Sequence, residues 1–267
     1  MPDKKTLLKD VINGYFDKFL MSGSSSAYFH GAFPQTFLHP RDYLEYAEIE
    51  MKQLENGENH LINCVGHLKR AIDSQLDTFL QILGVHSVFQ KRSLKFDKKL
   101  EFLKEIDVVS PRTLSRFNRI RNEIEHKFNL PLDLDVEVFF DLSTAFISSI
   151  ELTIVLLTRC EITYDILKYG DRYEEVDGVF VSTNKDENKD EPEIIKGDFF
   201  EMNHQFPSPE ISASWNLDGK QETINIKLSN SSSESDVAEF AYFIKVFVLL
   251  LKFDGFGTSN LYVYDHI

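Results

Sequence analysis

The spacing of apolar residues changes about two thirds of the way along this chain of 267 residues, and that change limits its possible folds more than any other feature. Up to about Lys168, apolar residues recur every three or four positions, which is the period of amphipathic helices. After Gly170, short alternating or β-branched runs replace them, as in strands. We therefore predict an α+β protein in which an all-α helical bundle precedes a smaller β-rich module with a C-terminal helix.

We place the bundle at 1–168, with an N-terminal extension over 1–40 whose membership of the bundle is left open, and the β-rich module at 169–267. Pro40 suits the first turn of a helix, and Gly57 and Gly84 are natural interruptions. Ser110 and Pro111 resemble an N-cap and a first-turn proline. The predicted helices are Pro40–Leu54, a long helix through Leu61 to Leu83, Phe96–Ile106, a helix from Ser110 to about Phe128, and a strongly apolar central helix from Asp135 to about Leu167.

The second module has the pattern of short strands joined by turns. Between two of these runs, Asn216 to Lys220 carries an Asp-Gly pair, which is a strong hairpin signal. The stretch Thr183–Pro192 is acidic and polar, and we expect a loop there. The predicted elements are strands within Gly178–Ser182, Glu193–Asn203, Glu210–Leu217 and Glu222–Leu228, a helix over Ser235–Phe253 and a further strand at Leu261–Tyr264.

The ends and the cysteines bear on the compartment. The N-terminus is polar, and the apolar stretch after it is broken by Asn13, Asp17 and Lys18, so neither a signal peptide nor a membrane anchor is expected. The apolar run Phe240–Phe253 contains Lys245 and is too short to span a bilayer. Two cysteines far apart in sequence form no disulfide framework. We expect a cytoplasmic protein.

The net charge of −14 is distributed unevenly. Up to Cys160 there are 20 basic and 22 acidic residues, whereas from Glu161 onward there are 9 basic and 21 acidic ones. Within Lys91–Lys127, 11 basic residues exceed 6 acidic ones. A basic segment in an acidic protein can attract a polyanion to one place, although the solvated face of a helix has the same pattern.

The segment Arg119–Phe128 carries the residues best suited to chemistry. On a helix, Asn122 and His126 are four positions apart, so the amide can orient the imidazole. Arg121 and His126 are five apart, or about 140° around a regular helix. They converge only if the helix end is distorted before Pro131 or if a second copy of the chain completes the site. The opposite, apolar face of this helix consists of Phe117, Ile120, Ile124 and Phe128.

Here the sequence resembles the HEPN superfamily, in which an Arg and a following polar residue precede a His by four to six positions on a late helix of an all-α bundle. Arg121, Asn122 and His126 match that motif, and the resemblance covers about Asp42 to Leu167. It implies a metal-independent endoribonuclease that acts as a homodimer. HEPN proteins are frequent in bacterial anti-phage and toxin systems, so a protein antitoxin or regulatory partner is also expected. Some members are inactive scaffolds, which leaves a dimerisation or interaction protein as the alternative.

The residue types suit RNA cleavage by the 2′-hydroxyl group. His126 has a side chain that exchanges protons near neutral pH. Arg121 offers a permanent, planar cation to the phosphate oxygens, and Asn122 orients or donates a hydrogen bond. Arg116, Arg119 and Lys127 are candidate contacts to the RNA backbone. The plainer interpretation is that Arg121 pairs with Glu125 and that His126 is exposed in a last helical turn.

Two further patterns bear on function. HEPN toxins paired with nucleotidyltransferase antitoxins commonly carry a modifiable Tyr two positions after the His, and this chain has Phe128 there. His60, Cys64 and His67 have helical spacings that suit zinc, but no fourth ligand is evident and Cys64 is expected in the core. No metal, no cofactor and no membrane contact are expected. His67 and Arg70, or Asp73 and Asp77, either line the same cleft as the motif or lie on a solvated face.

Overall fold

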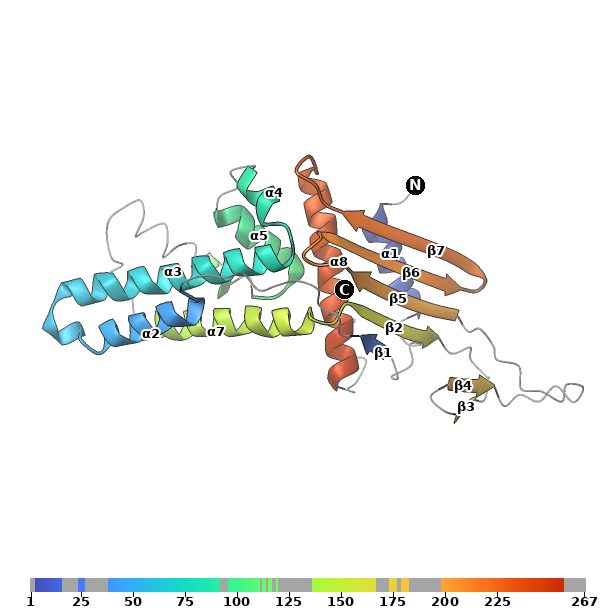
Figure 1. Ribbon diagram of the computed structural model, residues 1–267, viewed down its shortest axis with the longest axis horizontal. Helices are drawn as coiled ribbons and strands as arrows, with labels where there is room; N and C mark the ends of the chain where they lie inside the picture. The colour runs from blue at the N-terminus through green and yellow to red at the C-terminus, as the bar shows by residue number, and fades with distance from the viewer. Residues whose placement is uncertain are drawn as a thin grey trace, which may run out of the picture.

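The computed structural model of this chain has the predicted α+β architecture, with helices before residue 160, most strands after it, and a long helix after those strands (Figure 1). The described residues are 3–15, 24–26, 38–91, 96–110, 112, 113, 115, 116, 119, 136–166, 173–176, 179–182 and 198–256.

Three helices lie side by side in an elongated arm (Figure 1). They are α2 (Pro40–Met51), α3 (Glu58–Ile82) and α7 (Val136–Leu156), and a short 3₁₀ turn, Leu54–Asn56, links the first two. After the C-terminal end of α3, the chain forms α4 (His86–Lys91) and α5 (Phe96–Ile106). An ion pair ties α2 to α7, because Arg41 Nε donates to Glu151 at 3.0 Å.

The predicted interruptions of the arm are confirmed. Pro40 is the first residue of α2, and Gly57 stands immediately before α3. Gly84 follows α3 with a φ of +73°, a left-handed conformation that favours glycine. The amides of Gly84 and Val85 donate to the carbonyls of Gln81 and Leu80 at 3.0 and 2.9 Å, which forms a Schellman motif.

The main sheet is antiparallel and has the strand order β1-β2-β5-β6-β7. Its strands are β1 (Ser24–Ser26), β2 (Glu161–Ile166), β5 (Asp198–His204), β6 (Glu210–Leu217) and β7 (Lys220–Lys227). A separate pair is formed by β3 (Tyr173–Val176) and β4 (Val179–Ser182). The predicted hairpin joins β6 to β7, where Asp218 and Gly219 both have positive φ, as a type I′ turn requires.

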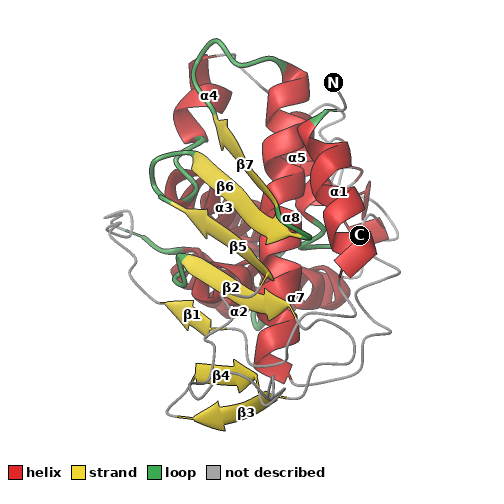
Figure 2. Cartoon of the chain, turned by 90° about the vertical axis from the view of Figure 1, so that its right-hand side faces the viewer, coloured by secondary structure: helices red, strands yellow, loops and turns green. Residues whose placement is uncertain are grey.

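One face of this sheet packs on α8 (Glu234–Phe256), as Figure 2 shows. The other face carries mostly polar side chains. Burial alternates along β6, with Ala213 and Trp215 buried between the half-buried residues of the other face. Along α8, nearly every residue from Phe240 to Leu251 is buried. The helix also contacts α5 and α7, and the Tyr164 hydroxyl on β2 donates to the Leu250 carbonyl at 2.9 Å. A single apolar core therefore runs through both halves.

The central helix predicted from Asp135 to about Leu167 is wrong in its last part. The helix α7 ends at Leu156, and Glu161–Ile166 is a strand between β1 and β5. In that segment Ile162 and Tyr164 are buried, whereas Glu161 is exposed. This alternation has the period of a strand, but it follows an apolar helix without a glycine or proline between them. The sheet consequently begins before residue 168.

The described part of the N-terminal extension lies against the sheet and α8. The helix α1 (Lys4–Tyr15) buries Leu8 and Ile12. Its Lys4 ammonium donates to the Asn225 carbonyl on β7 at 2.9 Å, and Lys5 Nζ lies 4.8 Å from the centre of the Tyr242 ring on α8. The strand β1 pairs with β2. The helix α1 thus shares the core of the sheet, on the opposite side of α8 from the arm (Figure 1).

Two predictions for the second module, the loop at Thr183–Pro192 and the strand at Leu261–Tyr264, fall outside the described residues. One helix among the described residues, α7, has the length and apolar composition of a membrane span, and 39% of its most apolar stretch is buried. Its buried side packs Phe146, Ile147 and Ile150 into the core. Core helices commonly meet the same criteria, so this is weak evidence for a span.

Candidate functional site

Arg121, Asn122, His126 and Lys127 lie outside the described residues, so the structure bears on the candidate site only through the helical turns that lead to it. Ser110 begins those turns, as the sequence predicts. Its hydroxyl oxygen accepts the Thr113 amide at 3.3 Å and lies 2.8 Å from the Thr113 hydroxyl. This is the geometry of an N-cap, three residues before the amide that it satisfies. Residues 112, 113, 115, 116 and 119 are helical after it.

Three exposed arginines follow this cap. Arg112, Arg116 and Arg119 are exposed and helical, and their spacings of four and three place them on one face. Arg116 and Arg119 are two of the residues that the sequence predicts as RNA contacts. Arg112 is not among those predicted contacts, although the same helical spacing identifies it. The described part of this helix therefore carries a stripe of exposed guanidinium groups on one face.

Other cations of the basic segment are neutralised within the protein. Lys98 Nζ lies 2.9 Å from Glu101 and 3.8 Å from Glu234. Lys99 pairs with Asp77 on α3, and the same carboxylate lies 3.9 Å from His86 Nε2. These pairs connect α5 to α8 and to α3. Lys104 and the three exposed arginines of this segment are in no ion pair with a residue of the described ranges.

A second polar cluster lies where α2 meets the start of α3. His60 Nδ1 is 2.7 Å from Glu50 Oε2, and the Asn63 amide donates to Glu50 Oε1 at 3.4 Å. The hydrogen bond from His60 is the main reason that the Glu50 pKa is below its usual value. His67 packs against two rings, with its centroid 6.5 Å from that of Tyr43 and 5.5 Å from that of Tyr46. Burial and, to a smaller extent, the charge of Arg70 lower the His67 pKa.

The three residues whose spacing suits zinc, His60, Cys64 and His67, do not converge on one point. His60 is engaged by Glu50, and His67 lies between the tyrosine rings. Cys64 is fully buried, as expected of a core cysteine, and burial raises the pKa of its thiol to about 11. Within the described ranges, no group of three or more His, Cys, Asp and Glu side chains could hold a metal ion. This cluster is therefore a packed polar contact between two helices.

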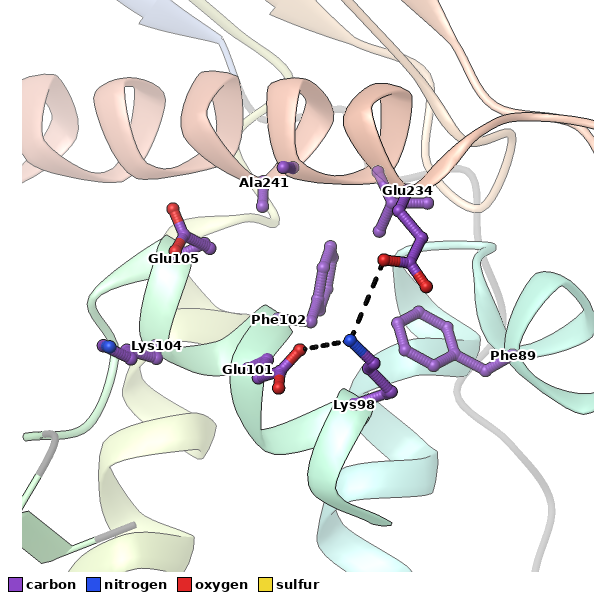
Figure 3. A pocket seen from close by; sticks show the side chains of 10 residues that line it. Phe89, Lys98, Glu101, Phe102, Lys104, Glu105, Glu234 and Ala241 are labelled. Carbon is purple, nitrogen blue, oxygen red and sulfur yellow. Dashed lines mark hydrogen bonds and ion pairs between the residues drawn. The ribbon is translucent and has the colours of Figure 1, made fainter. Parts of the chain in front are cut away.

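A pocket of about 420 Å³ opens where α4 and α5 meet the first turns of α8 (Figure 3). Its apolar wall consists of Phe89, Phe102, Val237, Ala238 and Ala241. Its charged lining consists of Lys98, Glu101, Lys104, Glu105 and Glu234. The Phe102 ring stands between α5 and α8, with Glu105 on one side and the Lys98–Glu234 pair on the other (Figure 3).

No sequence pattern identifies this pocket. It is formed by residues 98–105 and 234–241, which are far apart in the sequence, and the second stretch has only the pattern of the start of an apolar helix.

No sequence pattern identifies the buried His204 either, because one of its hydrogen-bond partners is distant in the sequence. Its Nε2 lies 2.9 Å from the Arg159 carbonyl oxygen, and its Nδ1 accepts the Phe206 amide at 3.3 Å. Burial lowers its pKa to about 4, so the ring is neutral in the folded protein at neutral pH.

Comparisons with known proteins leave the family open. No protein-family model, no curated protein and no solved structure matches this chain.

Proposed function

We propose that this protein is a metal-independent endoribonuclease of the HEPN type. The observation that carries the proposal is the motif Arg121-Asn122 with His126 four positions after the asparagine. The cap at Ser110 and the helical residues after it support a helical setting for that motif. The exposed Arg116 and Arg119 support a role for the same helix in holding a phosphate backbone.

The proposed reaction is an internal transesterification. The 2′-hydroxyl oxygen of the RNA attacks the adjacent phosphorus, a cyclic phosphate forms, and the bond to the 5′-oxygen of the next nucleotide breaks. One proton leaves the attacking hydroxyl and one is delivered to the leaving oxygen. His126 transfers protons, Arg121 stabilises the charge on the phosphate oxygens, and Asn122 orients the imidazole. No metal or other cofactor takes part in this scheme.

Two proton transfers in one step call for two groups. His126 supplies one of them, and in a homodimer the same residue of the second copy supplies the other. A dimer also brings together an Arg and a His that are about 140° apart around a regular helix. We accordingly propose a cytoplasmic homodimer that acts on RNA without membrane contact.

The biological setting is proposed from the resemblance alone. HEPN nucleases are common in bacterial toxin and antiviral defence systems, and such enzymes are held inactive by an antitoxin or another regulatory partner. The acidic second module is a candidate restraint on the basic helix, because its negative charge repels RNA. In this chain Phe128 has no hydroxyl group that a nucleotidyltransferase could modify.

A second candidate function is an interaction protein in which the same bundle serves only for dimerisation. Exposed apolar side chains on the arm favour it. Ile62 on α3 and Leu152 and Val155 on α7 are 59%, 57% and 62% exposed, respectively. Leu152 and Val155 lie three positions apart on α7, and contiguous exposed apolar side chains are typical of a site that binds another protein. The two functions differ in whether His126 is needed for RNA cleavage.

The test is cleavage of labelled structured and unstructured RNA in EDTA by the wild type, His126→Ala and Arg121→Ala. The matched control is Lys9→Ala, which removes an exposed helical cation from α1. Loss of cleavage in both motif variants, with unchanged circular dichroism and full activity of the control, is the expected result. Full activity in either motif variant contradicts the proposal, and an inert wild type favours the interaction protein.

A further inference from the structure

The pocket between α5 and α8 has the size and lining of a small-molecule site. Its volume of about 420 Å³ falls in the range of ligand pockets, roughly 300–1,000 Å³. Its apolar wall is built from three helices, and Phe89 and Phe102 meet edge to face with centroids 5.5 Å apart. Ala238 and Ala241 on α8 leave the space open that larger side chains would fill. An apolar body of modest size fits this wall.

The charged residues of the lining determine which ligand charge the pocket favours. Three carboxylates, Glu101, Glu105 and Glu234, face two ammonium groups, those of Lys98 and Lys104. Lys98 is already engaged by Glu101 and Glu234 at 2.9 and 3.8 Å. Those two carboxylates hold its pKa above the usual value. A ligand anion would therefore meet surplus negative charge, whereas a cation would be attracted.

The Lys98 side chain shows how the site takes an ammonium group. It is a primary amine on a four-carbon stem, held by one carboxylate from α5 and one from α8 (Figure 3). On the other side of the Phe102 ring, Glu105 is exposed. It makes no ion pair with any residue of the described ranges. Glu105 is thus the carboxylate available to a second, external ammonium group beside the same apolar wall.

We propose that this pocket binds a small organic ammonium ion with an apolar body, with the ammonium group on Glu105 and the body against Phe102, Val237 and Ala241. This site is independent of the proposed nuclease motif. Because the pocket is shared by α5 and α8, an occupant contacts both halves of the molecule. Its binding stabilises the folded state by an amount that grows with the logarithm of the free ligand concentration relative to Kd.

The experiment is a calorimetric titration of the full chain at neutral pH with phenethylamine and with hexylamine. Phenethyl alcohol and phenylacetate serve as neutral and anionic controls of nearly the same shape. Both amines are expected to bind saturably and to raise the midpoint of thermal unfolding. The alcohol is expected to bind about fivefold more weakly than phenethylamine, as suits one partly exposed charge pair, and phenylacetate more weakly still.

Two variants locate the binding. Ala238→Leu fills the pocket and is expected to abolish binding of both amines, whereas Glu105→Gln reduces phenethylamine to the affinity of the alcohol. The control is Glu239→Gln, which lies next to Ala238 on α8 but outside the pocket lining, and it is expected to keep wild-type affinity. The proposal is overturned if neither amine binds saturably. It is also overturned if the three phenethyl compounds bind equally or if Glu105→Gln leaves the amine affinity unchanged.

Discussion

The two long apolar helices, α7 and α8, look alike in sequence but have different places in the molecule. The helix α8 is enclosed by the sheet on one side and by α1, α5 and α7 on others, and Phe240, Phe243 and Phe247 are fully buried. The helix α7 contacts α2 and α3 in the arm and leaves Leu152 and Val155 exposed. Apolar composition therefore predicts that part of a helix surface is buried. The number of elements packed around the helix determines how many of its faces are buried.

The largest expected difference between the helices is in core truncation. Phe247→Ala on α8 is expected to lower the free energy of unfolding by about 3–5 kcal/mol, because a fully buried aromatic ring is lost and a cavity remains. Leu152→Ala on α7 is expected to change it by less than about 0.5 kcal/mol, since that side chain is already solvated. Denaturant unfolding of both variants measures the difference. Equal losses would show that the exposed face of α7 is covered in solution.

The junction of the two helices is expected to be sensitive to pH. His204 on β5 stacks on Phe206, packs against Phe247 of α8, and binds the Arg159 carbonyl just after α7. Its pKa is about 4 in the folded protein against an ordinary 6.5, so the unfolded chain binds more protons between these values. Stability from this group is complete above pH 6.5 and is lost as the pH falls toward 4. The loss amounts to roughly 3 kcal/mol.

The measurement is the free energy of unfolding as a function of pH for the wild type and His204→Gln. The variant lacks the titrating group, so the difference between the two curves narrows as the pH falls from 6.5 toward 4. Parallel curves over that interval would show that His204 titrates normally in the folded state.

A glycine pair tests how tightly the arm is seated on the sheet. At Gly84 an added Cβ would lie 1.7 Å from the Pro207 carbonyl oxygen, and the φ of +73° disfavours a side chain. Gly84→Ala is therefore expected to cost at least about 1–2 kcal/mol. Gly66→Ala, within α3 and with nothing within 4 Å of the added Cβ, is expected to stabilise the protein by up to about 1 kcal/mol. Thermal unfolding compares the two, and equal effects would mean that the turn after α3 is loosely held.

The smallest expected effects come from buried hydroxyl groups on the two helices. Thr144 on α7 and Tyr242 on α8 bury hydroxyl oxygens that have no hydrogen-bond partner within the described part of the chain. Burial raises the Tyr242 pKa to about 12. Thr144→Val and Tyr242→Phe are each expected to be neutral or to stabilise by up to about 1 kcal/mol, because an unsatisfied polar group is removed. A loss above 1 kcal/mol in either variant would reveal a partner for that hydroxyl.

Local sequence patterns predicted much of this fold. The helix Phe96–Ile106 and the strand Glu210–Leu217 have the predicted bounds, since each carries a clear period and is followed by an aspartate with positive φ, Asp107 and Asp218 respectively. The predicted helix through Leu167 failed at β2, because pairing with β1 and β5 overrides the apolar run. The contacts of α1 with α8 and the α5–α8 pocket arise from residues far apart in sequence, for which one sequence carries no signal.

The candidate site also has features that local sequence predicts and a feature that depends on distant contacts. Ser110 as an N-cap and the exposed Arg116 and Arg119 follow from local pattern and are found in the structure. Whether Arg121 and His126 converge depends on the end of one helix or on a second copy of the chain. The spacing of the motif is compatible with both arrangements. The motif therefore predicts which residue types act in the proposed reaction, whereas their geometry depends on tertiary or quaternary contacts.

The most direct test of the central claim is the chemistry of the cut ends. RNA is incubated with the wild type in EDTA, beside His126→Ala, and the termini of the products are identified by mass spectrometry. We predict cyclic-phosphate ends and free 5′-hydroxyl groups from the wild type alone. Cleavage that stops in EDTA, leaves 5′-phosphate ends or persists in His126→Ala would contradict a metal-independent nuclease centred on His126.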